Sequence, residues 1–225
     1  MPAWFEQAPP GDDGPEGRLA RSLVAAKRFL DAAAAADVLA GLPGGAPAPD
    51  RAALAAAEVD HVGLLAPAGA RPLLEAAAER AGFTAGGIAF PSVLLARELA
   101  ARTGRTRPTT VVKRFGHTPA GRRVAVEVFV AAYDDAELRR WIAEGVGVHV
   151  ALAVAAPAFA DALRILSGRG LAMPAFTDGR PHFIAGEDVT IAYFEHAHAA
   201  PARRLEVRGP GNLTDAGRAR RSASG

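Results

Sequence analysis

Two stretches of the chain begin with a histidine in an apolar, strand-like run and continue into a helical pattern of similar length. The first reads HVGLLAP from His61 and then ARPLLEAAAERAG; the second reads HVALAVAAP from His149 and then AFADALRILSGRG. In both stretches the histidine precedes a helix-ending glycine, Gly82 or Gly170, by 21 residues. Because matched spacing is the signature of an internal repeat, the sequence predicts two copies of one supersecondary unit.

Three further strand-like runs follow the helix in each copy. They read FTAGGIAF, TTVVKRFG and RVAVEVFVAAY in the first copy, and LAMPAF, PHFIAG and VTIAYFEHAH in the second. Each copy is therefore predicted to be a βαβββ module. An amphipathic helix, PSVLLARELAARTG at 91–104, is inserted into the first copy and is expected to cover one mouth of the site.

The flanking segments have a different character from the two copies. Apolar residues at helical spacing predict a helix over 18–42, and a second short helix is expected at 50–59. The fold class is thus α+β, with paired modules and a helical N-terminal extension. The predicted parts are a helical extension with a disordered lead (1–57), the first module with its inserted helix (58–144), the second module (145–208) and a mobile basic tail (209–225).

Composition excludes several classes of function. The 26 Lys and Arg residues nearly balance 24 Asp and Glu residues, and much of the basic excess lies in the tail, so no nucleic-acid partner is expected. The absence of cysteine excludes disulfides and thiolate metal sites, so that a metal would need His, Asp or Glu ligands. Neither a signal-peptide pattern nor a membrane-length apolar stretch occurs, and a cytoplasmic protein without a membrane partner is expected.

Each module also carries a glutamate on its last predicted strand, Glu127 in VAVEVFV and Glu195 at the end of TIAYFE. A lone histidine in an apolar strand is most often a core residue, but matched histidines in two copies favour metal ligation. With Glu195, His61 and His149 form a two-histidine, one-carboxylate set that leaves open positions on Fe(II), and the same ligands suit Zn, Ni or Mn. Glu127 is compatible with a fourth ligand, a general base or a solvent-facing charge; we expect it not to bind the metal.

Residues 58–198 resemble the vicinal oxygen chelate superfamily (glyoxalases and extradiol dioxygenases), whose paired βαβββ modules form an open barrel around a metal. The resemblance implies that His61, His149 and Glu195 bind Fe(II), as in the oxygenases of that superfamily. Glu127 corresponds to a position that also ligates in its isomerases and lyases. The helical extension, DHVGLL, the helix after GGIAFPS, VEVFVA and AYFEHA are most similar to the 2-oxoadipate dioxygenase/decarboxylase family. That family has a carboxylate-binding arginine four residues after the first histidine, where this chain has Leu65.

Other polar residues are candidates for substrate binding. VVKRFGH places Lys113, Arg114 and His117 near a strand end, where Arg114 could bind a carboxylate through two hydrogen bonds. A solvated strand end explains the same pattern equally well. Three further histidines near the end of the second module are His182, His196 and His198.

These features predict a non-haem Fe(II) oxygenase that oxidises a small carboxylate or 2-oxo acid with O₂, as a monomer or homodimer. Glu127 and Arg114 are the expected catalytic and substrate-binding residues. One alternative is an isomerase or lyase in which Zn, Ni or Mn acts as a Lewis acid and Glu127 moves a proton. Another is a non-catalytic small-molecule binding or resistance protein.

Overall fold

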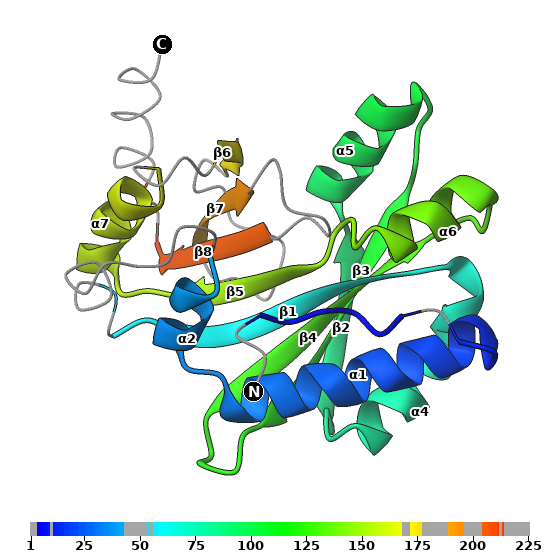
Figure 1. Ribbon diagram of the computed structural model, residues 1–225, viewed down its shortest axis with the longest axis horizontal. Helices are drawn as coiled ribbons and strands as arrows, with labels where there is room; N and C mark the ends of the chain where they lie inside the picture. The colour runs from blue at the N-terminus through cyan, green and yellow to red at the C-terminus, as the bar shows by residue number, and fades with distance from the viewer. Residues whose placement is uncertain are drawn as a thin grey trace. The chain divides into compact units, whose positions relative to one another are not determined.

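The chain divides into two structural units, and each unit contains one βαβββ copy. The helices and strands of both copies are labelled in Figure 1. The computed structural model describes residues 4–9, 11–42, 54, 56–167, 172–176, 189–195, 204–211 and 213. The first unit comprises Met1–Ala32 and His61–His149, and the second comprises Ala33–Asp60 and Val150–Gly225. The predicted α+β fold with two βαβββ copies is confirmed.

The first unit contains a four-stranded sheet in the order β2-β3-β4-β1. β1 and β4 are parallel, whereas β2 with β3 and β3 with β4 are antiparallel. Helix α4 (Arg71–Arg80) follows β1 after the short helix η1 (Ala68–Ala70). The strands are β1 (Glu58–Ala66), β2 (Ala85–Pro91), β3 (Thr109–His117) and β4 (Arg123–Ala131).

The register of this sheet decides which side chains share a face. His61 lies opposite Ala125, while Gly63 and Lys113 both lie opposite Glu127. Because side chains alternate along a strand, the side chains of His61, Lys113 and Glu127 point to one face and that of Arg114 points to the other. The candidate site is therefore on the first of these faces.

Helices cover both faces of the first-unit sheet (Figure 1). α1 (Gly14–Ala32) and α4 lie on one side, and α5 (Val93–Thr103) and α6 (Ala136–Ala143) lie on the other. α5 confirms the predicted inserted helix. Its N-cap is Ser92, whose hydroxyl accepts a hydrogen bond from the Leu95 N–H at 3.4 Å.

The predicted helix over 18–42 is divided in the structure. α1 ends at Ala32, and α2 (Ala35–Ala40) begins three residues later. The break falls within five consecutive alanines, residues 32–36, which provide no apolar contrast from which periodicity could locate it. α1 buries one helical face at spacings of three and four residues, through Leu19, Leu23, Ala26 and Leu30.

The second unit repeats the strand order of the first, as β6-β7-β8-β5. β6 pairs antiparallel with β7, and β7 pairs antiparallel with β8. Its helix α7 (Ala156–Ser167) buries Phe159 and Leu163. The strands are β5 (His149–Ala153), β6 (Ala172–Phe176), β7 (Val189–Glu195) and β8 (Arg204–Pro210).

The prediction that the strand ending at Glu195 closes the second copy is wrong. β7 occupies the third-strand position and β8 the fourth, equivalent to β4 in the first copy. β8 extends through Gly209 and Pro210, where the mobile tail was predicted to begin. The predicted strand at 181–186 lies outside the described residues, as do residues 50–53 and 55 of the predicted helix at 50–59, whose last two residues begin β1. Among the helices that the structure describes, none combines the length and apolar character needed to cross a membrane.

Candidate metal centre

His61 and His149 face each other inside the first unit. His61 is on β1 and His149 begins β5, so both lie on the first strand of their copy as predicted. The Nε2 atoms are 3.2 Å apart and both side chains are almost completely buried, at 0% and 1% exposure. The two rings are nearly perpendicular, at 86°. The repeat therefore brings its two matched histidines together.

A backbone contact fixes the tautomer of His149. Its Nδ1 lies 3.0 Å from the carbonyl oxygen of Gly147. Because a carbonyl oxygen only accepts hydrogen bonds, Nδ1 carries the proton and donates it. In the neutral form of this ring Nε2 then has the lone pair, on the side that faces Nε2 of His61. A hydrogen bond of this kind from Nδ1 is what orients histidine ligands in metal sites.

The separation of the two nitrogens fits a shared metal ion. Histidine nitrogens bind metals such as zinc at about 2.0–2.1 Å. Two such ligands are then about 2.8–3.0 Å apart at an octahedral angle and about 3.3–3.4 Å apart at a tetrahedral one. The observed separation of 3.2 Å lies between these two values, so it is compatible with a metal ion shared by the two nitrogens.

Gly63 makes room for the His149 ring. A Cβ atom built on Gly63 would overlap Cε1 and Nδ1 of His149 and lie 2.9 Å from its Nε2. Any larger residue at this position of β1 would displace the ring. The glycine two residues after His61 is therefore part of the site, a role that the sequence analysis did not assign to it.

A buried ion pair lies beside the histidines. Oε2 of Glu127 is 3.6 Å from Nε2 of His61, and Oε1 of Glu127 is 2.9 Å from Nζ of Lys113. Glu127 and Lys113 are both buried. A buried carboxylate needs a partner of this kind to remain charged. The first unit thus contains a buried His-His-Glu group together with one cation.

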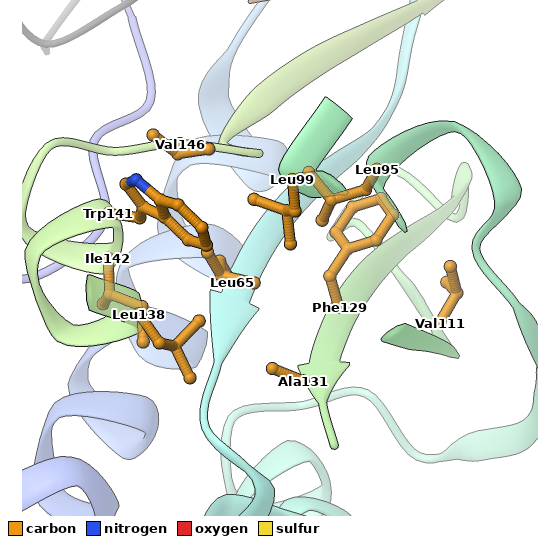
Figure 2. Close-up of a cluster of buried hydrophobic side chains, with 10 residues drawn as sticks. All are labelled: Leu65, Leu95, Leu99, Val111, Phe129, Ala131, Leu138, Trp141, Ile142 and Val146. Atoms are coloured by element: carbon orange, nitrogen blue, oxygen red, sulfur yellow. The ribbon is translucent and has the colours of Figure 1, made fainter. Parts of the chain in front are cut away.

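The first unit also contains an apolar cluster of buried side chains (Figure 2). Phe129 belongs to the cluster, and its ring centroid is 5.7 Å from that of His149. Leu95 and Leu99 of α5 pack in the same cluster, so the inserted helix covers this face of the sheet. Leu65, where the resemblance would place an arginine, also packs there and is fully buried.

Arg114 is not brought together with the histidine pair. Its guanidinium lies 3.5 Å from Glu79 and 3.9 Å from Glu75, both on α4, on the opposite face of the sheet. Its neighbour Lys113 is the cation on the histidine face. His117 is exposed at the end of β3.

Two glutamates lie on the last two strands of the second copy: Glu195, which the sequence predicts as a ligand, and Glu206. Glu195 lies on the third strand of its copy and is 3.6 Å from Arg204. Glu206 lies on the fourth strand, as Glu127 does in the first copy, and is 2% exposed. Glu206 is opposite Tyr193 in the β7–β8 register, so Glu206 and Glu195 point to the same face of their sheet.

Glu206 and Lys113 were not assigned to the site from the sequence. In RLEVRGP the residues Leu205, Val207 and Gly209 are buried and alternate with charged ones. This alternation is typical of a strand and would have placed Glu206 on a last strand of the second copy. Lys113 follows from the register alone, which places it opposite Glu127. His182, His196 and His198 lie outside the described residues.

Comparisons with known proteins identify similar folds only. No family model and no curated protein matches the chain. A variant of 4-hydroxymandelate synthase from Streptomyces coelicolor is 11% identical with a TM-score of 0.47, over 71% of this chain and 51% of that one. The chain thus spans about half the length of that protein. Methylmalonyl-CoA epimerase from the same organism is 20% identical with a TM-score of 0.37, over 66% of this chain and 95% of that one. Both are members of the vicinal oxygen chelate superfamily, and at these scores neither indicates an activity.

Proposed function

We propose that this chain is a metal-dependent enzyme of the vicinal oxygen chelate type, in which His61 and His149 bind the metal. The observation that supports this proposal is the buried pair of Nε2 atoms at 3.2 Å, with one lone pair oriented by the Gly147 carbonyl. Within that class we propose a non-haem Fe(II) oxygenase that acts on a small carboxylate or 2-oxo acid. Fe(II), when bound, would supply the reaction with O₂.

We propose Glu206 as the third protein ligand in place of Glu195. Support comes from the equivalence of the two copies, because Glu206 occupies the fourth strand as Glu127 does in the first copy. The resemblance implies a ligand on the last strand of the second module, and that strand is β8. Burial of the Glu206 carboxylate is consistent with this role, since buried carboxylates pair with cations or metals.

The surrounding residues have distinct proposed roles. Leu65 stands where the similar family has a carboxylate-binding arginine, and Lys113 provides a positive charge in its place. Lys113 can bind a substrate carboxylate, and its hydrogen bond to Glu127 keeps that glutamate ionised. Glu127, beside His61 but bonded to Lys113, can accept a proton from the substrate. Phe129 and the cluster under α5 exclude water from one side of the site.

Metal loading and oxygen consumption test the proposal. The protein would be loaded anaerobically with Fe(II), and O₂ uptake would be measured with 2-oxoadipate, shorter 2-oxo acids and the corresponding saturated acids. We expect about one iron per chain and O₂ uptake that depends on one of these substrates. Equal iron content in wild type and in His61→Ala with His149→Ala would overturn the metal site.

A lyase or isomerase is the second candidate, and the position of Glu127 favours it. Its carboxylate lies 3.6 Å from the nitrogen that would bind the metal, close enough to complete a four-ligand site after a small shift. Such a site leaves too few positions for substrate and O₂ together. Turnover by the Zn, Ni or Mn form without O₂, together with metal loss in Glu127→Gln, would establish this alternative.

A further inference from the structure

A cavity whose lining contains neither His61 nor His149 lies in the first unit. Its volume is about 210 Å³. Apolar residues form most of its wall, contributed by the end of β1, by α1 and by α6: Leu19, Leu65, Ala66, Pro67 and Ile142. Pockets for drug-sized ligands usually have about 300 Å³ or more, so this cavity suits a smaller molecule.

Arg18 places a positive charge in this apolar wall. Its Nε donates to the Ala8 carbonyl at 2.6 Å and its Nη2 donates to the Ile142 carbonyl at 3.0 Å. Within the part of the chain that the structure describes, no carboxylate pairs with this guanidinium. The other charged side chains of the wall, Asp134 and Arg139, pair with each other at 2.9 Å. The cavity therefore has one net positive charge.

The Arg18 guanidinium is partly desolvated. Burial lowers the pKa of the Arg18 guanidinium from its ordinary value, because the loss of water around the group disfavours the charged form. Arginine nevertheless stays charged. An anion that entered the cavity would pair with a cation already desolvated in part, where charge-assisted hydrogen bonds are strongest.

Gln7 also lines the cavity and has a buried acceptor. Its Nε2 donates to the Leu65 carbonyl at 2.9 Å, which fixes the orientation of the amide. Its Oε1 is buried and has no hydrogen-bond donor among the described residues. A buried acceptor without a donor is costly, and a ligand hydroxyl or N–H would satisfy it.

We propose that this cavity binds a small carboxylic acid with an apolar body and a hydrogen-bond donor, whose carboxylate pairs with Arg18 and whose donor bonds Oε1 of Gln7. This site is separate from the metal centre and goes beyond the proposed function. A hydroxylated aromatic acid has the three required features. We therefore choose 4-hydroxybenzoate as the probe.

Two related compounds isolate the contributions of the two polar residues. 4-Hydroxybenzamide replaces the carboxylate with a neutral amide, and benzoate lacks the hydroxyl. Titration calorimetry on metal-free protein should show 4-hydroxybenzoate binding roughly tenfold or more tightly than 4-hydroxybenzamide, and several-fold more tightly than benzoate. Absence of binding, or equal affinity for the acid and the amide, would overturn the proposal.

Variants test whether 4-hydroxybenzoate binds in this cavity. Arg18→Gln should lower the affinity for 4-hydroxybenzoate roughly tenfold, while Arg28→Gln, which removes the same charge from an exposed position of α1, should leave it unchanged. The comparison of ligands in wild type remains decisive if Arg18→Gln fails to fold. Binding must also persist in His61→Ala with His149→Ala. If that double variant loses it, the probe binds at the histidine pair and the cavity proposal is wrong.

Discussion

At the scale of single residues, the candidate centre depends on a glycine as much as on its histidines. Gly63→Ala would place a methyl group against the His149 ring and break its alignment with His61. We expect metal affinity to fall roughly 10- to 100-fold, as for other changes that misalign metal ligands. Metal titration monitored by calorimetry measures this. Gly69→Ala is the matched control, because no atom lies within 4 Å of a Cβ built there.

The three glutamates can be distinguished by their amide variants. Glu206→Gln should lose most of the bound metal, because a neutral amide is a weaker ligand than a carboxylate. Glu127→Gln should keep its metal content near that of wild type, since Glu127 is bonded to Lys113, but should lose activity. Metal analysis of the purified variants decides whether the third ligand comes from β7, which carries Glu195, or from β8, which carries Glu206. Greater loss in Glu195→Gln than in Glu206→Gln would restore the assignment made from the sequence.

At the scale of elements, periodicity predicted the helices and strands whose apolar residues are regularly spaced. The histidine strands, both repeat helices and α5 have clear apolar spacing or caps, and each is present in the structure. α6 was not predicted because it has only eight residues, although Leu138, Trp141 and Ile142 lie on one face. β8 was hidden by its nearness to a Gly- and Arg-rich end. The histidine pair followed from the repeat, whereas the Lys113–Glu127 contact required the register of β3 and β4.

Asp135, the N-cap residue of helix α6, connects the helix to Arg107, two residues before β3. The Asp135 side chain accepts from the Leu138 N–H at 2.8 Å and pairs with Arg107 at 2.7 Å. The hydrogen bond from the Leu138 backbone, followed by that from Arg107, lowers the pKa of Asp135. Because the folded-state pKa is the lower one, ionised Asp135 stabilises the fold above the unfolded value of about 3.9. This contribution is lost as the pH falls through the folded-state pKa.

Asp135→Asn tests this coupling of helix α6 to pH. Asparagine can still cap the helix but does not titrate. At neutral pH we expect the variant to have a lower Tm than wild type, and below about pH 4 the difference should shrink. Scanning calorimetry across this pH range measures the effect. Asp12→Asn, an exposed change, is the control; an unchanged Tm difference down to low pH in Asp135→Asn would refute the assignment.

At the scale of the whole molecule, the two histidines proposed to bind the metal come from first strands far apart in the sequence. They are separated by 87 residues that include the complete set β2, β3 and β4. A metal held by both would therefore bind the folded chain and not the unfolded one. A ligand selective for the folded state stabilises it by RT ln(1 + [L]/Kd), or about 2.7 kcal/mol at a hundredfold excess over Kd.

For a chain of this length, that free energy corresponds to a rise in Tm of roughly 5–11 °C. We expect scanning calorimetry to show this rise with excess Zn(II), chosen because it does not oxidise, and to show its reversal by EDTA. His61→Ala with His149→Ala should unfold at one Tm regardless of metal. His117→Ala, which removes an exposed histidine, should retain the full shift. A comparable rise in the double variant would mean that Zn(II) binds elsewhere, and the paired histidines would then have only a packing role.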